Sequence, residues 1–272
     1  MILGYNTNGF AFHTLEQAIE IIAGLGYGAV AITLDHHALN PFSDSMPDEL
    51  KLVKSLVESN QLACVVETGS RFLLDPMRKH WPTLLERQKS DRDRRVAFLK
   101  RAIDIAAELP PGIVSFWSGI RPAEQPPDDA FAVLVESCIE LSDYAALNGV
   151  TLAFEPEPEM FIDTAAKWEH LAGAVRRANF KLTLDVGHLW CNEEPPQADI
   201  IRKYARPLAN VHLDDMLRGV HDHLFFGDGE VDFPAVIGAL DEIGYAGPAC
   251  IELSRHSHQA VETARHAKLF FE

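Results

Sequence analysis

The chain has 272 residues, of which 47% are hydrophobic and 24% charged, a balance typical of a folded protein with a sizeable core. Its net charge of −16 opposes binding to nucleic acid, because affinity for a phosphate backbone comes largely from Lys and Arg. No apolar run approaches the roughly 18–20 residues of a membrane span. The N-terminal MILGYNTNGF also lacks the basic start of a secretory signal, so we expect a cytoplasmic protein with no membrane partner.

Short apolar runs alternate with longer amphipathic stretches along the whole chain, a pattern typical of repeated β-α units around a parallel sheet. The predicted strands are residues 2–6, 29–34, 63–67, 113–117, 151–155, 181–185, 210–214 and 249–253. No linker divides the chain, and no G-x-G-x-x-G follows the first strand, which disfavours an open nucleotide-binding sheet. We therefore predict an α/β fold, a (β/α)8 TIM barrel that forms a single domain over residues 1–272.

Local signals mark several element ends. Thr14 with Gln17 forms a capping-box pattern, and Asp163 and Asp232 stand where N-caps are expected. The joints LGYGAVAITL (25–34) and IGYAGPACIEL (243–253) both place a Gly where a helix ends in a left-handed cap, followed by Tyr and a strand. The four cysteines are scattered without a C-x-x-C pair, which favours buried free thiols.

The active site of such a barrel lies at the carboxyl ends of its strands, and these ends are rich in acidic residues and histidines. The residues there are Glu67, Glu155, Asp185 with His188 three residues later, His212 and Glu252. Carboxylates that converge on one mouth repel one another unless a cation neutralises them. We therefore predict a divalent metal held by Glu155, Asp185, His212 and Glu252, although Asp185 alone is also explained as a helix cap and His188 as a buried hydrogen-bonding residue.

The stretch NVHLDDMLRGVHDHLFFGDGEVDF (210–233) holds three histidines and six acidic residues. Its potential metal ligands are His212, Asp214, Asp215, His221, Asp222 and His223. A solvated acidic loop explains the carboxylates but not the histidines. The GDG segment is expected to turn the loop back, since glycine permits positive φ.

Five segments together resemble the xylose-isomerase-like TIM barrels along the length of the chain. These are FEPEPEMFIDT (154–164), LTLDVGH (182–188), NVHLDD (210–215), HDHLFFGDGEVDF (221–233) and CIEL (250–253). That superfamily includes sugar-phosphate isomerases and epimerases, ketohexose epimerases, inosose dehydratases and AP endonucleases. The resemblance implies the same four metal ligands, and His188 and Arg218 match positions that contact substrate in the epimerases.

The chain also departs from its relatives. AP endonucleases bind several zinc ions with histidines after strands three and four, where this chain has Glu67 and Trp117–Ser118. After strand seven, His221 and His223 match the D-x-H pair that contributes to that zinc site. The epimerases usually carry a Glu six residues beyond the strand-five ligand, where this chain has Phe161, with Glu157 and Glu159 nearby.

These observations favour a metal-dependent isomerase or epimerase of a sugar, a sugar phosphate or a related polyol or keto compound. Glu155 or Glu252 would remove the proton next to a carbonyl, the metal would stabilise the enediolate, and the other carboxylate would return the proton. A mainly oxygen site suits Mn²⁺, Mg²⁺ or Co²⁺, and the added histidines make Zn²⁺ acceptable. His188 and Arg218 are expected to hold substrate oxygens.

Alternatives stay open at this stage. A hydrolase would activate water, with His221 and His223 holding a possible second metal ion. An inosose-type dehydratase would use the same metal. A barrel that only binds a sugar-like ligand has no use for the paired Glu155 and Glu252.

The segment TGSRFLLDPMRKHWPT (68–83) follows the third strand and brings Arg71, Arg78, Lys79 and His80 near the same mouth. These residues form either a clamp for a substrate phosphate or carboxylate or a solvated charged loop. We predict substrate contacts for Arg71 and Glu67. Three apolar residues, Phe225, Phe226 and Trp81, suggest either a homodimer interface or a pocket lining.

Overall fold

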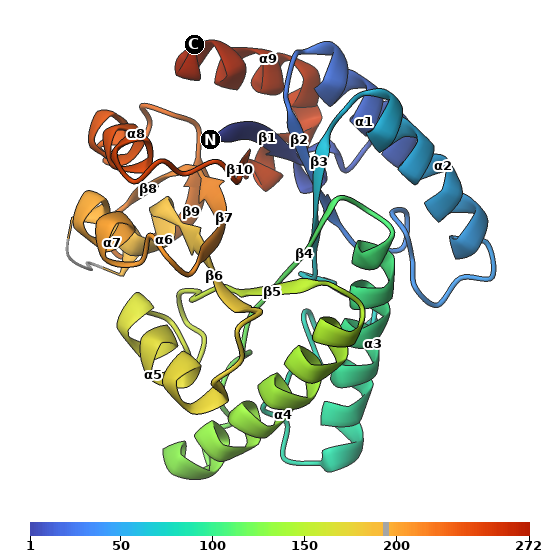
Figure 1. Ribbon diagram of the computed structural model, residues 1–272, viewed down its shortest axis with the longest axis vertical. Coiled ribbons are helices and arrows are strands. Elements are labelled where there is room, and N and C mark those ends of the chain that lie inside the picture. The colour runs from blue at the N-terminus through green and yellow to red at the C-terminus, as the bar shows by residue number, and fades with distance from the viewer. Residues whose placement is uncertain (193–195) are drawn as a thin grey trace.

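The computed structural model describes residues 1–192 and 196–272, and eight parallel strands close into a barrel at its centre (Figure 1). These strands are β1 (Ile2–Asn6), β2 (Ala29–Thr33), β3 (Ala63–Glu67), β4 (Pro111–Phe116), β5 (Thr151–Phe154), β6 (Phe180–Asp185), β7 (Leu208–Leu213) and β10 (Pro248–Ile251). β10 pairs with β1 and closes the barrel. The predicted fold and all eight predicted strands are confirmed, with no end more than two residues from its predicted position.

Helices surround the barrel (Figure 1). They are α1 (Leu15–Gly24), α2 (Met46–Ser59), α3 (Lys89–Ala107), α4 (Pro127–Leu147), α5 (Ala165–Val175), α7 (Gln197–Lys203), α8 (Phe233–Glu242) and α9 (Ala260–Phe271). The short α6 (Val186–Cys191) follows β6 directly, and the 3-10 helices η1 (Thr7–Phe10) and η2 (Ser254–Gln259) follow β1 and β10. Apolar side chains such as Ile19 and Ile22 of α1 pack with Val30 and Ile32 of β2 in the main core.

Two of the three predicted caps are confirmed. Thr14 and Gln17 form both hydrogen bonds of a capping box, and the Asp232 carboxylate accepts from the backbone N–H of Ala235. The prediction for Asp163 was wrong. Thr164 caps α5 instead, accepting from the Lys167 N–H, while the Asp163 carboxylate forms an ion pair with Lys167 Nζ at 2.6 Å.

The two repeated helix-to-strand joints adopt the predicted backbone. Gly26 and Gly244 have φ angles of +84° and +64°, in the left-handed region that favours glycine. The following tyrosines then donate hydrogen bonds, Tyr27 to the carbonyl of Ala264 and Tyr245 to that of Pro248. The similar sequences thus make similar turns, and the four cysteines are buried and free as predicted.

The interior of the barrel is filled by every second residue of its strands. Small and apolar residues form a separate cluster there: Ala29, Ala31, Val65, Ile113, Ala153 and Cys250. Gly4 belongs to the same tight layer, since a Cβ on it would lie 2.6 Å from Cys250 Sγ. Two residues further along β3, β5 and β10 come Glu67, Glu155 and Glu252, so the same alternation turns these carboxylates inward above the apolar layer.

The antiparallel hairpin of β8 (Asp215–Leu217) and β9 (Val220–Leu224) was not predicted, and it lies inside the stretch that we treated as a loop. Its strands have only three and five residues, too few to show a regular apolar alternation. Asp215 stabilises the turn beyond the hairpin, because its carboxylate accepts from the N–H groups of Gly227, Gly229 and Val231. Gly227 has the expected positive φ of +94°.

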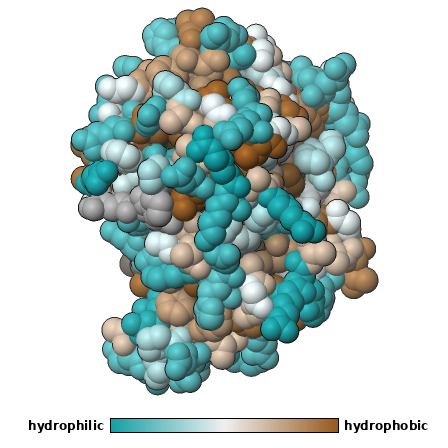
Figure 2. Space-filling model, turned by 60° about the vertical axis from the view of Figure 1, so that its left-hand side comes forward, coloured by the Kyte–Doolittle hydropathy of each residue, from teal (hydrophilic) through white to brown (hydrophobic). Residues whose placement is uncertain are grey.

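The three apolar residues that suggested a dimer interface pack against other residues of the chain. Phe226 is only 5% exposed and stacks on Phe270 of α9, and Trp81 lies beneath the guanidinium of Arg78. Phe225 is partly buried against the core. The face drawn in Figure 2 intersperses hydrophilic and hydrophobic side chains. A homodimer therefore stays a prediction. No helix within the described ranges is long and apolar enough to span a membrane.

Candidate metal centre and active site

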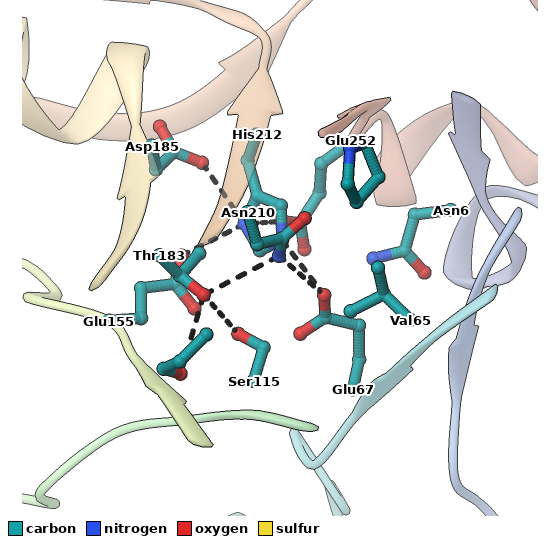
Figure 3. A network of polar contacts seen from close by, with 12 residues as sticks. Asn6, Val65, Glu67, Ser115, Glu155, Thr183, Asp185, Asn210, His212 and Glu252 are labelled. Atoms are coloured by element: carbon teal, nitrogen blue, oxygen red, sulfur yellow. Dashed lines mark hydrogen bonds and ion pairs between the residues drawn. The ribbon is translucent and has the colours of Figure 1, made fainter. Parts of the chain in front are cut away.

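Four side chains meet at the carboxyl end of the barrel (Figure 3). Asp185 ends β6 and His212 lies on β7, while Glu155 and Glu252 directly follow β5 and β10. Each offers one ligand atom, and these atoms all lie within 4.8 Å of one another. The structure thus brings together the four residues that we predicted as metal ligands, from four different strands.

His212 is the centre of this cluster, and its two ring nitrogens face different partners. Nδ1 lies 3.0 Å from Glu155 Oε1, 3.0 Å from Glu252 Oε2 and 3.7 Å from Asp185 Oδ2. In the apo protein a proton on Nδ1 would therefore occupy the point on which three carboxylates converge. A divalent cation placed there would replace that proton and neutralise more of the negative charge.

The other nitrogen of His212 faces Glu67, which ends β3. Nε2 lies 2.9 Å from Glu67 Oε1, and the Asn210 amide donates to the same oxygen at 3.2 Å. A carboxylate that accepts the remaining N–H of a metal-bound histidine fixes its tautomer and orientation. Glu67, which we predicted as a substrate contact, thus holds His212 and also lines the cavity above it.

The donor set fits a divalent ion. Asp185 uses Oδ1 to accept the backbone N–H of His188 at 2.9 Å, which caps α6. Its Oδ2 is buried and accepts no hydrogen bond from any residue of the described ranges. Both readings of Asp185, helix cap and ligand, are therefore compatible, because each carboxylate oxygen serves a separate purpose. Three carboxylates and one imidazole suit hard or borderline divalent metals.

Crowding of these groups shifts their pKa values. Burial raises the pKa of Glu155 to about 7, with Glu252 and Glu67 adding to the rise and His212 opposing it. Burial would also raise the pKa of Glu252, but His212, His223 and His188 outweigh it and hold it far below its usual range. The pKa of His212 is well above its usual range because Glu155, Glu67 and Glu252 overcome the effect of burial.

A second group of potential ligands lies beside the first. Ligand atoms of His188, His221 and His223 lie within 4.8 Å of one another, as do those of Asp185, Asp214 and His223. His188 Nε2 is 3.2 Å from His221 Nε2, and His223 Nδ1 pairs with Asp214 Oδ2 at 2.5 Å. The unpredicted hairpin therefore carries both additional histidines over the mouth of the barrel.

These imidazoles differ in charge. Burial lowers the pKa of His188 to about 3, so its ring is neutral at pH 7. Burial would also lower the pKa of His223, but Asp214 raises it to about 10, which makes that ring a cation. The pKa of His221 falls through burial and the charge of His223.

The four-residue cluster forms the floor of a cavity of about 390 Å³. Of the predicted site residues, Glu67, Arg71, Glu155, His188, His212, His221, His223 and Glu252 line it. Asp185 lies beneath the surface, almost fully buried. Arg218 is not part of the lining. It is exposed on the turn between β8 and β9, with its guanidinium 4.6 Å from the centre of the Trp190 ring.

Two acidic residues of the 210–233 stretch serve other purposes than the ligation we considered. Asp215 is fully buried and binds the backbone of the following turn. Asp222 forms an ion pair with Arg255 at 2.8 Å. Composition identified both as ligand types, but only the path of the hairpin assigns them to these contacts.

Some cavity residues were missed. Asn8 donates from Nδ2 to Glu252 Oε1 at 2.7 Å and so positions that carboxylate. Glu157 lines the cavity, and burial, Glu155 and Glu252 raise the pKa of its carboxyl well above the usual range. Asn8 lies just beyond the end of the first strand, so the argument from strand ends could have found it. Glu157 was noted only as a neighbour of Phe161.

Residues 12–272 match the family described as Xylose isomerase-like TIM barrel. The chain belongs to this family. Among its curated relatives, the L-ribulose-5-phosphate 3-epimerase of Salmonella paratyphi C (strain RKS4594) is 25% identical over 194 residues, covering 71% of this chain and 68% of that protein. The inosose dehydratase of Klebsiella pneumoniae subsp. pneumoniae is 29% identical over 144 residues, covering 46% of this chain and 48% of that protein.

Solved structures share the xylose isomerase-like fold. A D-allulose 3-epimerase from Methylomonas sp. in complex with D-allulose superposes with a TM-score of 0.79 at 21% identity, covering 100% of this chain and 96% of that one. A structure described as IOLI protein with a binding zinc atom has a TM-score of 0.78 at 18% identity, covering 99% and 97%. Together, the family and its relatives support an enzyme of the isomerase and epimerase kind.

Proposed function

We propose that this protein is a metal-dependent isomerase or epimerase of a sugar or a related keto compound. The observation that carries the proposal is the pair of carboxylates, Glu155 and Glu252, which both lie 3.0 Å from His212 Nδ1 on the floor of the cavity. Two such groups allow one to remove a proton from carbon and the other to return it. Sugar epimerases among the relatives support the same reaction class.

The metal site of the proposal consists of Glu155, Asp185, His212 and Glu252. The buried Asp185 Oδ2, which accepts no hydrogen bond from the described residues, and the convergence of the other three groups support these ligands. A divalent ion bound there would polarise the substrate carbonyl and bind an adjacent hydroxyl. We propose Mn²⁺, Mg²⁺ or Co²⁺ from the oxygen-rich donor set, and Zn²⁺ remains compatible with it.

Side chains of the cavity are assigned the proton transfers and the binding of the substrate oxygen. One carboxylate, Glu155 or Glu252, takes the proton from the carbon next to the carbonyl, and the other delivers a proton to the reacting carbon. Asn8 holds Glu252 by its amide, so the carboxylate keeps one orientation during both steps. His188 is neutral and can donate one N–H to a substrate oxygen as negative charge develops there.

Arg218 is a proposed substrate contact by its matching position in the epimerases. Since it lies outside the cavity lining, its participation would require the turn between β8 and β9 to move. Glu157, in contrast, already reaches the cavity from the segment after β5. We propose that Glu157 takes the substrate-contacting place that Phe161 cannot fill.

Hydrogen exchange with solvent tests the reaction. Metal-loaded protein in D₂O should incorporate deuterium next to the carbonyl of at least one compound in a panel of ketoses, inososes and their phosphates. Glu252→Gln should reduce that exchange by about 10²–10⁴-fold, the range for removing a general acid or base. Wild-type protein that exchanges no compound of the panel would exclude the proposed function.

The second candidate is a hydrolase or phosphatase with two metal ions. The three imidazoles of His188, His221 and His223 favour it, because their ligand atoms lie close enough to hold a possible second metal ion beside the first. Metal analysis of protein purified without chelators separates the candidates. About one ion per chain supports the isomerase, whereas two ions, with one lost in His221→Ala and His223→Ala, support the hydrolase.

A further inference from the structure

The segment between β3 and α3 brings positive charge to one wall of the cavity. Arg71 and Lys79 both line the cavity from this segment. Arg255, a further cationic residue of the lining, is already paired with Asp222 at 2.8 Å. The floor carries the carboxylates of the metal cluster, so the cavity is acidic at its base and basic on this wall.

Neither cation of this wall has a strong partner. Among the residues whose positions are described, Arg71 pairs only with Asp35, at 3.9 Å between Nε and Oδ2. Lys79 makes no hydrogen bond or ion pair with residues of the ranges described here. Arg78, its neighbour in sequence, is different, because its guanidinium donates to the Asp75 carboxylate and stacks on Trp81.

A third cation lies behind the same wall. Arg95 of α3 is fully buried, donating from Nη1 to Ser70 Oγ at 2.7 Å and from Nη2 to the carbonyl of Thr68 at 2.9 Å. Its guanidinium lies 4.4 Å from the centre of the Trp117 ring. No carboxylate within the described part of the chain pairs with it. A buried charge without a counter-ion is costly, and an anion bound in the cavity would reduce that cost.

His80 lies on the same wall, and the positive charges of Arg71, Lys79 and Arg95 affect its pKa. It hydrogen-bonds the carbonyl of Gly69 and lines the cavity between the loop and Trp117. Burial, followed by the charges of Lys79, Arg95 and Arg71, lowers the pKa of His80 to about 4, and the hydrogen bond to Gly69 opposes this shift. The backbone N–H of His80 also donates to the carbonyl of Arg71, and Arg95 binds Ser70, the residue before Arg71, so the cations lie close together along this segment.

We propose that this wall binds an anionic group of the substrate, a phosphate or a carboxylate, through Arg71 and Lys79 with the buried charge of Arg95 behind them. The inference rests on the proposed function and narrows its substrate to acidic sugar derivatives. The carboxylates of the floor would repel the anion, and the cations of the wall would attract it. The substrate would thus bind in one orientation, with its uncharged carbonyl end towards the metal cluster.

Binding of small anions tests the wall without turnover. Inorganic phosphate and D-gluconate are titrated into metal-loaded protein by calorimetry, so that the two arms distinguish a phosphate site from a carboxylate site. Arg71→Gln and Lys79→Gln should each weaken the preferred anion about tenfold, the loss expected for a charge-assisted hydrogen bond. Lys89→Gln is the matched control, since Lys89 is exposed on α3, where it pairs with Asp93, and does not line the cavity.

Turnover of an acidic substrate and of its neutral counterpart provides a second test. Solvent exchange is compared for D-ribulose 5-phosphate and D-ribulose, and for any other pair in which the panel finds activity. The wall variants should raise KM for the acidic compound about tenfold more than KM for the neutral one.

Equal anion binding by wild type and the Arg71→Gln/Lys79→Gln double variant would overturn the anion site, as would preference for the neutral ketose. Anion binding that depends on Arg71 and Lys79, without any hydrogen exchange, would retain the site and reject only the isomerase.

Discussion

At the scale of single residues, His212 contacts carboxylates with both of its ring nitrogens. Its Nδ1 faces the carboxylates of Glu155, Asp185 and Glu252, whereas its Nε2 faces Glu67 at 2.9 Å. Because both nitrogens are engaged, the ring has one orientation and one useful tautomer for binding a metal. Glu67, which fixes this tautomer, is not one of the four proposed metal ligands.

Replacing Glu67 with Gln should therefore weaken metal binding. The amide keeps the size of the side chain but removes the negative charge that favours a proton on Nε2, and loss of such a partner typically costs 10–100-fold in affinity. Titration with Mn²⁺ or Co²⁺, followed by calorimetry, measures the change. Ser115→Ala, at another position of the cavity lining, removes the hydrogen bond that Ser115 accepts from Thr183 and should leave the affinity within about twofold. Unchanged affinity in Glu67→Gln would contradict this role.

The lowered pKa of His80 predicts that this residue contributes to the pH dependence of the free energy of unfolding. Its pKa falls from 6.5 to about 4 on folding, through burial and then Lys79, Arg95 and Arg71. The unfolded chain therefore binds the proton more readily, so this contribution is fully present above pH 6.5 and is lost as the pH falls towards 4.

The expected loss is about 1–3 kcal/mol, allowing for partial exposure of the ring. Denaturant unfolding of metal-free protein at several pH values measures it. His80→Gln should lose less stability than wild type between pH 6.5 and 4, and parallel curves for the two proteins would disprove the assignment.

At the scale of elements, the hairpin of β8 and β9 depends on Asp215. Its carboxylate is buried and accepts from the N–H groups of Gly227, Gly229 and Val231, which hold the chain between β9 and α8. Gly229 must be a glycine, since a Cβ there would lie 2.3 Å from Asp215 Oδ1. This contact connects the GDG turn to the strand end that carries His212 and Asp214.

Asp215→Asn should destabilise the protein by about 2–4 kcal/mol, because an amide NH₂ would replace an acceptor that faces backbone donors. Chemical denaturation gives the free energy of unfolding. Asp228→Asn changes the same charge at an exposed position of the same turn and should alter stability by less than about 0.5 kcal/mol. Equal effects of the two substitutions would show that net charge, not the hydrogen bonds, decides stability.

At the scale of the whole molecule, four strands of the barrel bring charged side chains to one point, three carboxylates and one imidazole. Glu155, Asp185 and Glu252 repel one another, and the protonated ring of His212 compensates only part of their charge. A bound divalent ion would therefore connect β5, β6, β7 and β10 and stabilise the closed barrel.

Metal removal should lower the melting temperature. Ligand at 100 times its dissociation constant adds about 2.7 kcal/mol, which corresponds to about 5–10 °C for a chain of this size. Calorimetry of metal-loaded protein with and without EDTA measures the shift, and added Mn²⁺ should reverse it. Asp185→Asn lacks one ligand and should respond less to EDTA. A melting temperature that EDTA does not change would argue against a resident metal.

The fold and the four-residue cluster could both be predicted because they depend on local pattern. Each strand is a short apolar run, and successive side chains alternate between its two faces. Glu155 and Glu252 lie at the same position of repeated units, two residues beyond Ala153 and Cys250 of the barrel interior. Since strand ends of a parallel barrel meet at one mouth, their sequence positions alone bring them together.

Only the tertiary structure assigned the contacts made by the loops. Glu67 holds His212 across 145 residues of sequence, Arg218 lies over Trp190 outside the cavity lining, and the buried Arg95 pairs with no carboxylate of residues 1–192 and 196–272. Periodicity cannot predict such contacts, because they depend on the path of each loop and on which nitrogen or oxygen faces a distant segment. The sequence by itself determined the barrel and the residues at its mouth, and the packing of remote segments decided their partners and the charge around them.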